Sequence, residues 1–258
     1  MLFQVSCSLP LSRVTQADSD TGDEPWASAY KALLDTPEAS PDYAVRGPGH
    51  TIGRGTGDSE IEGWSKAFDV DGVAAQLNGI AFSINGDKAH ADKVAEIVDK
   101  WSGTLETVAN KDNILVGWAG RLLANGAELV RYTNGAWPTG EDNYRRAQKM
   151  VSDVLVPNVY AAARPDADQP AAGGNQAILG HMAAMEFAIF TDNVTGFNDQ
   201  LDVLKLPKKC ENFGGSGIRA LLHPETGQNA ETGRDQAHAG MEVGFTEESA
   251  QVAANQGT

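Results

Sequence analysis

The sequence predicts an all-α fold built from successive antiparallel helical hairpins. Apolar residues recur with a helical period along most of the chain, whereas the alternating β-branched segments typical of strands are scarce. The chain has 258 residues, of which 41% are hydrophobic, and this is enough to bury the core of one domain. We therefore expect a single helical domain over residues 25–258, preceded by a loose polar leader over residues 1–24.

The first helical hairpin is predicted on both sides of Asn85-Gly-Asp87, which is a typical turn sequence. Each side of this turn carries one apolar stripe at helical spacing, so the two helices should pack against each other in antiparallel fashion. The stripe before the turn consists of Val70, Val73, Ala74, Leu77, Ile80 and Ala81, and the stripe after it of Val94, Ile97, Val98, Trp101, Leu105 and Val108.

Further helices are predicted downstream of this hairpin. Their ranges are 115–132, closed by Asn134-Gly135; 144–156, which should stop before Pro157; 177–190; 197–206; and 245–254. The range 177–190 is almost wholly apolar, so it should be an inner helix. Three long loops are expected at 46–63, 161–174 and 207–233, and long loops without secondary structure of their own are commonly functional.

The bulk composition restricts the partners and the compartment. The formal net charge of −15 argues against binding to nucleic acid or to an anionic membrane, since both require a basic surface. It would also repel a polyanionic substrate unless a local cluster of cations reverses the field. No apolar run approaches the ~18 residues that cross a bilayer. Cys7 and Cys210 form no CxxC pair, so a thiolate zinc site is not indicated, while one disulfide between them stays open.

The chemically densest segment runs from Gly227 to His238 and reads GQNAETGRDQAH. If a helix begins after Gly233, Arg234 and His238 stand at positions i and i+4 and lean over one face, with Glu242 one turn further along. Arginine offers a fork of donors and histidine exchanges a proton near neutral pH, so the pair suits recognition of a sugar carboxylate. The local sequence leaves open the alternative of a merely capped and hydrated helix start.

Several segments together carry a family resemblance, and Glu231–His238 is the most specific of them. The others are Trp26–Tyr30, Ala124–Tyr132, Gly174–Gln176, Met182–Met185 and Phe190–Asp192. From about Pro25 to the C-terminus the chain resembles the alginate lyase superfamily of polysaccharide lyases. The resemblance implies an incomplete (α/α) toroid of helical hairpins that cleaves acidic polysaccharides by β-elimination in a groove. It also implies an extracellular location and no cofactor.

β-Elimination on a uronate requires a neutralised carboxylate, a base for the C5 proton and an acid for the departing oxygen. The resemblance implies that Asn175 binds the carboxylate with help from Arg234, and that His238 is the base or a further carboxylate partner. Gln176 and Gln236 are the implied substrate-binding neighbours. From local sequence alone, Asn175 could equally be the N-cap of the helix that follows it.

The chain departs from the family pattern at the acid–base position. Many toroidal lyases carry a tyrosine about two helical turns beyond the active-site arginine, but here no tyrosine follows Tyr160. A catalytic tyrosine would have to be one of Tyr30, Tyr43, Tyr132, Tyr144 and Tyr160. Gln176 stands where many relatives have tryptophan, and Ala254 also replaces an aromatic residue. A non-catalytic homologue that binds glycans or proteins is therefore the alternative function.

Relatives continue through further helices beyond the position of Thr258. We therefore expect the helix over 241–254 to lack its covering neighbour and to leave apolar surface exposed at Val243, Phe245 and Val252. This surface predicts pairing of the C-terminal helix with another copy of the chain or with a partner.

The remaining motifs favour structural roles. The histidines form neither an HExxH motif nor a close cluster, so their spacing does not support a metal site. His181 should be a core histidine with satisfied hydrogen bonds. Gly53–Gly57 lacks the lysine of a phosphate-binding loop and should be a mobile loop, and Asp69–Gly72 is only a fragment of a calcium loop. Trp101 and Trp118 should pack in the core, whereas Trp137 should be exposed near a turn.

Overall fold

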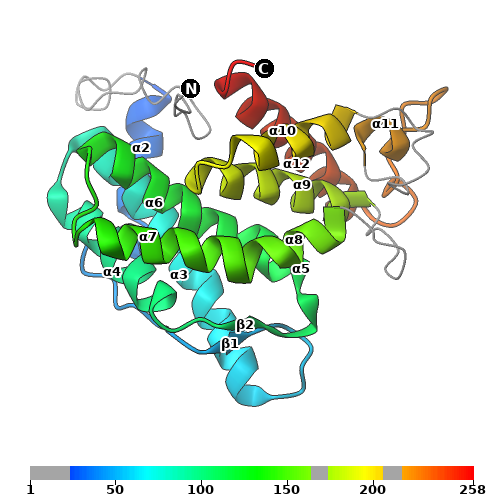
Figure 1. Cartoon of the computed structure of the whole chain (residues 1–258). Coiled ribbons are helices and arrows are strands. Elements are labelled where there is room, and N and C mark those ends of the chain that lie inside the picture. Colours follow the sequence, from blue (N-terminus) through cyan, green and yellow to red (C-terminus); the bar gives the residue numbers. More distant parts are fainter. Residues whose placement is uncertain (1–23, 164–173, 206–216) are drawn as a thin grey trace.

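The computed structural model describes residues 24–163, 174–205 and 217–258. Most of the predicted leader, both cysteines and parts of the loops 161–174 and 207–233 lie outside these residues. The described chain is an array of helices, as predicted, in which the helix pairs run antiparallel (Figure 1). Its only strands, β1 (Thr51–Ile52) and β2 (Thr107–Val108), form a short parallel pair within the described residues.

The helices follow one another in a simple order along the chain. They are α2 (Trp26–Leu34), α3 (Ser59–Asn85), α4 (Lys88–Ser102), α5 (Asn113–Leu115), α6 (Arg121–Asn134), α7 (Glu141–Met150), α8 (Val156–Ala163), α9 (Gly174–Phe190), α10 (Val194–Lys205), α11 (Ile218–Leu221) and α12 (Gln236–Asn255). Short 3₁₀ turns lie at Pro37–Ala39 and Ala109–Lys111, and π-helical turns at Val116–Gly120 and Val151–Leu155. None of the helices in the described ranges is long and apolar enough to span a bilayer.

The first predicted hairpin is confirmed as α3 and α4, and its local chemistry explains where the helices end. Gly86 closes α3 with φ of 69°, a left-handed conformation that glycine adopts without a Cβ clash. Asp87 then begins α4, because its side chain accepts a hydrogen bond from the backbone N–H of Ala89.

The prediction that a helix stops before Pro157 is wrong. Helical backbone continues from α7 through the π turn Val151–Leu155 into α8, which contains Pro157. A proline ring normally clashes with the carbonyl four residues earlier and cannot donate to it. Here the wider π turn lies at that point, and the side chain of Asn158 donates to the Val154 carbonyl at 2.7 Å.

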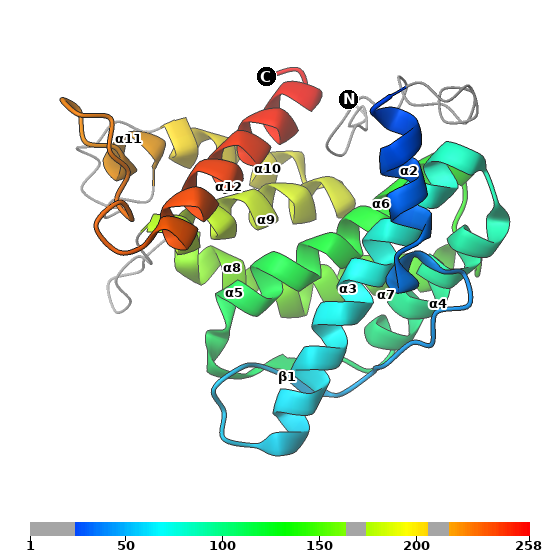
Figure 2. The same cartoon turned by 180° about the vertical axis from the view of Figure 1, so that it is seen from behind.

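Helices α3 and α6 form the centre of the N-terminal part of the molecule and pack closely along much of their length (Figure 2). The close approach depends on glycine. A Cβ atom added to Gly126 would lie 2.3 Å from the Ala75 carbonyl oxygen, and one on Gly79 would lie 2.9 Å from Gly126. Any larger residue at either position would push the two helices apart.

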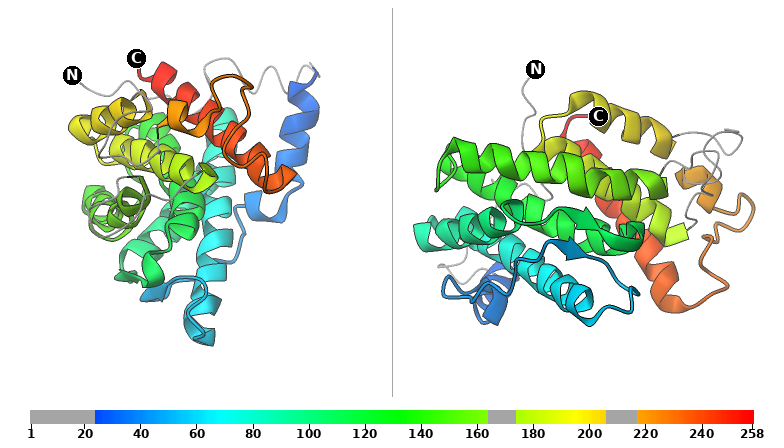
Figure 3. Two further views of the ribbon diagram at one scale, coloured as in Figure 1. Left: turned by 90° about the vertical axis from the view of Figure 1, so that its right-hand side faces the viewer. Right: turned by 60° about the horizontal axis from the view of Figure 1, so that its bottom comes forward.

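Helix α9 connects the two hydrophobic cores and is buried almost completely, as predicted for 177–190. One side, including Phe187 and Phe190, packs into the core formed with α3, α4, α6 and α7. Another side, including Met182 and Met185, packs with α10 and α12. His181 of this helix is fully buried with Nδ1 2.9 Å from the Gln200 side chain, so the core assignment is confirmed. Figure 3 shows α9 between α10 and the N-terminal helices.

Two predictions about exposed apolar residues are wrong. In α12, Phe245 and Val252 are buried because α9 covers this helix, and of the three residues predicted to be exposed only Val243 is. The apolar surface on which the predicted pairing of copies depends is therefore smaller than expected. Trp137 is also buried, since its ring packs against Tyr144 and its indole N–H donates to Asp99.

Candidate active site

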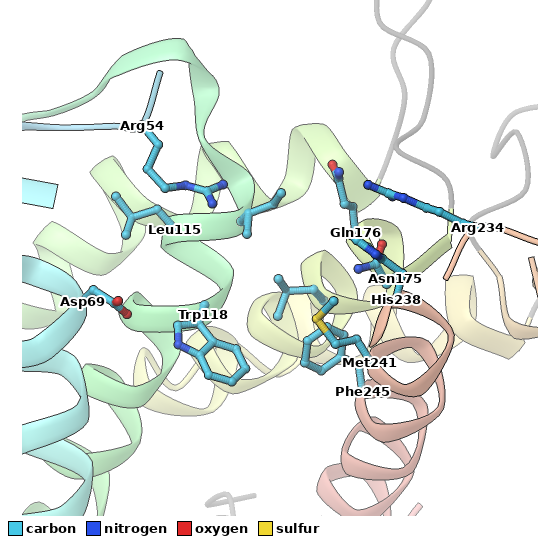
Figure 4. A pocket seen from close by; sticks show the side chains of 12 residues that line it. Arg54, Asp69, Leu115, Trp118, Asn175, Gln176, Arg234, His238, Met241 and Phe245 are labelled. Carbon is cyan, nitrogen blue, oxygen red and sulfur yellow. The ribbon is translucent and has the colours of Figure 1, made fainter. Parts of the chain in front are cut away.

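A cavity of about 440 Å³ lies between the N-terminal helices and the pair α9 and α12 (Figure 4). One wall comes from the N-terminal part of the chain, and the other from the start of α9 and the start of α12. We call these the N-terminal wall and the C-terminal wall. The lining residues are Arg54, Asp69, Ile114, Leu115, Trp118, Asn175, Gln176, Leu179, Arg234, His238, Met241 and Phe245. Four of the five predicted site residues are among them.

Asn175 lies in the first turn of α9 and is only 7% exposed. Its backbone N–H donates to the side chain of Glu231 at 3.3 Å, which ties the start of α9 to the segment before α12. Its side-chain Oδ1 is buried without a hydrogen-bond partner. The side chain therefore does not cap the helix in this conformation, and a buried polar group of this kind is better satisfied when a ligand supplies the missing partner.

Arg234 reaches the cavity from the turn that precedes α12. The predicted helical spacing of Arg234 and His238 is wrong, because α12 begins at Gln236 and its N-cap is Asp235. The guanidinium is held only loosely, at 3.6 Å from Glu231 and 3.9 Å from Asp235. About half of the Arg234 side chain (53%) is exposed, so several of its donors can face a ligand.

His238 lies in the first turn of α12 and is oriented by Asp235. The Asp235 carboxylate accepts the His238 backbone N–H at 2.9 Å and contacts imidazole Nδ1 at 2.5 Å. These hydrogen bonds, the backbone one first, hold the pKa of Asp235 below its usual range. An ionised carboxylate at Nδ1 fixes the proton on that nitrogen and leaves Nε2 as the free basic atom.

Two residues of the predicted segment lie elsewhere. Glu242 does not share the face of His238 that lines the cavity; it is 3% exposed and accepts the backbone N–H of Glu231 at 3.2 Å. The residues of α12 that do line the cavity with His238 are Met241 and Phe245. Gln236 begins α12 and is not among the lining residues, whereas Gln176 is.

The N-terminal wall contributes Arg54, which the sequence reasoning assigned to a mobile loop. Its guanidinium binds the Asp112 carboxylate through two hydrogen bonds of 2.8 Å, and its backbone N–H donates to the same carboxylate at 2.8 Å. Burial alone would raise the pKa of Asp112, but the hydrogen bonds from Arg54 and from the Leu115 backbone hold it below its usual range. The loop is therefore fixed in place around this ion pair.

Asp69 and Trp118 complete the N-terminal wall. Asp69 lies on α3, and its Oδ1 is buried without a hydrogen-bond partner. Burial raises the pKa of Asp69, and the positive charge of Arg54 opposes that shift. The prediction that Trp118 packs in the core is wrong, since 42% of this residue is exposed. It lies in the π turn Val116–Gly120, which shifts the helical register by one residue and turns the indole out to the cavity.

None of the five tyrosines of the chain, all of which lie in the described ranges, lines the cavity. Tyr43 and Tyr144 are buried in the scaffold, where Tyr43 donates to Asp71 and Tyr144 packs against Phe190. Among the described residues there is also no group of three or more His, Cys, Asp and Glu that could hold a metal ion. Among the described lining residues, the polar side-chain groups are thus two guanidiniums, two amides, one imidazole, one carboxyl and the indole N–H of Trp118.

The chain matches no protein-family model and no curated protein. Among solved structures it is similar to an alginate lyase from Bacteroides ovatus, with a TM-score of 0.59 and 12% sequence identity. The similarity covers 96% of this chain and 75% of the lyase chain. At this level of identity the likeness establishes a shared helical fold, and the chemistry of the cavity has to be argued from its own residues.

Proposed function

We propose that this chain is a polysaccharide lyase that cleaves a uronic acid polymer by β-elimination. The single observation that carries the proposal is that Asn175, Arg234 and His238 line one cavity in a chain with the fold of an alginate lyase. Asn175 is about 60 positions from Arg234 and His238 in the sequence, and only the fold can bring it beside them.

In the proposed reaction Asn175 and Arg234 bind the uronate carboxylate. Charge neutralisation by a guanidinium and an amide makes the C5 proton more acidic, because the negative charge that develops on the carboxylate is stabilised. Gln176 next to Asn175 offers a further amide for a sugar hydroxyl. Arg54 on the N-terminal wall adds a second guanidinium, which its hydrogen bonds to Asp112 hold in place.

His238 is the proposed base. Its Nδ1 faces Asp235 at 2.5 Å, so Nε2 is the atom that can take the C5 proton. The Asp235 carboxylate would also stabilise the imidazolium that forms. Asp235 touches the imidazole and not the substrate, and its role would be to position and polarise His238.

Trp118 is the proposed stacking platform for a sugar ring. Its half-exposed indole faces the cavity, and the guanidinium of Arg121 lies over the ring at 5.6 Å from its centroid. Stacking on this ring would compensate for Gln176, which stands where many toroidal lyases have tryptophan. The apolar side chains of Leu179, Met241 and Phe245 lie beside it and would exclude water from the reacting atoms.

A second candidate function is non-catalytic glycan binding, which the lack of any tyrosine in the cavity favours. Elimination creates a C4=C5 double bond conjugated with the carboxylate, and this product absorbs in the ultraviolet. The test is to follow this absorbance with the purified chain on alginate, glucuronan and polygalacturonate. Product on at least one polymer supports the lyase. Binding of a polymer without any product, measured by calorimetry, would overturn the lyase and support the glycan-binding function.

A further inference from the structure

We propose that Glu231 is a positioning residue that holds Asn175 and Arg234 together as one binding unit for the uronate carboxylate. This inference rests on the proposed lyase function and adds a residue that is not among those lining the cavity. Asn175 belongs to α9 and Arg234 to the turn before α12, yet Figure 4 places both at the same end of the cavity. The distance between them must be fixed, because a carboxylate bound by both groups tolerates little displacement of either.

The carboxylate of Glu231 contacts both groups. Its Oε1 accepts the Asn175 backbone N–H at 3.3 Å, and its Oε2 lies 3.6 Å from the Arg234 guanidinium. The Glu231 side chain is only 11% exposed, so it is held inside the structure. Each oxygen therefore serves one partner, and the carboxylate spans the gap between the start of α9 and the turn before α12.

The backbone of Glu231 is fixed on both sides of its Cα. Its N–H donates to the Glu242 carboxylate of α12 at 3.2 Å. Its carbonyl accepts the Arg234 backbone N–H at 2.9 Å, which closes a turn that brings the Arg234 side chain back toward the Glu231 carboxylate. Glu231 is therefore attached to the start of α12, and its side chain extends that attachment to α9.

Gly174 leaves the space that the Glu231 carboxylate occupies. Its φ of 57° lies in the left-handed region that favours glycine, and a Cβ atom added there would lie 2.1 Å from Oε1 of Glu231. The first turn of a helix has N–H groups without partners inside the helix, and a carboxylate is a favourable acceptor for them. The contact with Asn175 alone would be a helix cap, and the contact with Arg234 connects this cap to the proposed site.

The charge of Glu231 also affects how Arg234 meets a substrate. Arg234 lies 3.6 Å from Glu231 and 3.9 Å from Asp235, so a uronate carboxylate must compete with two anions for the guanidinium. A neutral residue that still accepts the Asn175 N–H should keep the geometry and let the uronate bind more tightly. A residue that only stabilised the start of α9 would not change the affinity in this direction.

The test compares two substitutions of Glu231 on the polymer that the wild-type chain cleaves. Glu231→Ala removes both contacts and should lower kcat by ~10²-fold, the scale of a displacement of about 1 Å. Glu231→Gln keeps an acceptor for the Asn175 N–H, so kcat should stay within about threefold of the wild type while KM falls about two- to fivefold, the strength of a half-exposed ion pair. Glu225→Ala and Glu225→Gln are the matched controls, because Glu225 is exposed in the same segment before α12 and does not line the cavity.

A double variant separates positioning from stability. If Glu231 acts through Arg234, the loss of kcat caused by Glu231→Ala should be about tenfold smaller in the Arg234→Ala background than in the wild type. Circular dichroism shows whether each variant is folded. Should Glu231→Ala not fold, Glu231→Asp takes its place, because the shorter side chain keeps the charge but cannot reach both partners. Its kcat must then lie below that of Glu231→Gln.

The outcomes that exclude the role of Glu231 differ from the one that excludes the lyase. Full activity of Glu231→Ala, equal losses of kcat for Glu231→Ala and Glu231→Gln, or an undiminished loss in the Arg234→Ala background would each overturn the positioning role. No product from alginate, glucuronan or polygalacturonate with the wild type would instead overturn the lyase function.

Calorimetry with the same three polymers then decides the inference without turnover. The polymer that the wild type binds should bind more weakly to Glu231→Ala and at least as tightly to Glu231→Gln. Any other order of affinities, or no binding of any polymer to the wild type, would overturn the role of Glu231 as well.

Discussion

The two walls of the cavity differ in how firmly their arginines are held. On the N-terminal wall, Arg54 makes three hydrogen bonds of 2.8 Å to Asp112, one of them from its backbone. On the C-terminal wall, Arg234 has only ion pairs at 3.6 and 3.9 Å. Asn175 beside it has a buried Oδ1 without a partner. The arginine of the N-terminal wall is thus already paired within the protein, whereas the arginine and the asparagine of the C-terminal wall have unused donors and acceptors.

This difference indicates which wall should act on the reacting atoms. Groups that the protein has already paired lose little freedom on binding and mainly give the cavity its shape and potential. Groups with unused donors and acceptors gain more from a ligand, and they gain most when charge develops on it. We therefore expect substitutions on the C-terminal wall to lower kcat strongly. Substitutions that release Arg54 on the N-terminal wall should mainly raise KM.

The largest effect is expected for His238→Ala. Removal of the proposed base should lower kcat by ~10²–10⁴-fold with little change in KM. The ultraviolet rate assay measures this directly. His50→Ala is the matched control, because 73% of the His50 side chain is exposed and the residue lies outside the cavity. Equal rates for His238→Ala and the wild type would remove His238 from the catalytic residues.

A somewhat smaller loss is expected for Arg234→Ala. Removing one preorganised donor from a developing anion costs ~10²–10³-fold in kcat. Arg234→Lys should recover only part of the loss, since an ammonium cannot reproduce the planar fork. Arg145→Ala, at a side chain that is 75% exposed on α7, is the control. If Arg234→Ala raises KM alone, the guanidinium binds the ground state and the transition state equally, and the contrast between the walls is weakened.

Most of the fold could be predicted from the sequence because helical periodicity and turn chemistry are local properties. The Asn85–Asp87 turn and the buried helix α9 are examples. The errors arose where a non-local or irregular feature intervened. A π turn rotated Trp118 out of the core, another carried the helix through Pro157, and α9 covered the apolar face of α12. None of these can be inferred from a strict 3.6-residue period.

The candidate site also has a part that could be predicted from the sequence and a part that could not. Arg234 and His238 lie in one short, chemically dense segment and could be named from it, whereas Asn175 and Gln176 could be named only through the family resemblance. Arg54 and Asp69 lie on separate segments of a wall that only the tertiary structure assembles. The one signal for Arg54 was a cation within a glycine-rich loop, and its partner Asp112 is 58 positions away. A single sequence contains no information about such pairs.

The next prediction concerns a network of ion pairs behind the cavity, formed by Glu186, Arg121 and Glu248. Glu186 of α9 lies 3.8 Å from Arg121, which also binds Glu248 of α12 at 2.8 Å. Burial raises the pKa of Glu186 from 4.5 to about 7, with Arg121 opposing the shift. The folded state therefore binds more protons than the unfolded state between these values, and the stability of the wild type should fall as pH rises through this range.

Glu186→Gln tests that network. The variant has no charge to bury, so it should be about 1–3 kcal/mol more stable than the wild type near pH 8, and the difference should vanish near pH 4. Urea unfolding at both pH values measures it. A variant that is less stable than the wild type near pH 8 would mean that the ion pair with Arg121 outweighs the burial of Glu186.

The smallest effect is expected for Asp112→Asn, which frees Arg54 without removing it. The released guanidinium must be ordered by the substrate, so KM should rise about tenfold, or about 1.4 kcal/mol, while kcat changes little. Folding should lose only about 1 kcal/mol, because half of the Arg54 side chain is exposed. The pKa of Asp112 is lowered in the folded state, so this contribution to the free energy of unfolding is present above the unfolded value of about 3.9 and disappears as pH falls below it.

Asp92→Asn is the matched control, because Asp92 is exposed on α4 and does not line the cavity. A fall in kcat as large as that of Arg234→Ala would show that both walls act on the transition state, and the distinction between a shaping wall and a reacting wall would no longer hold.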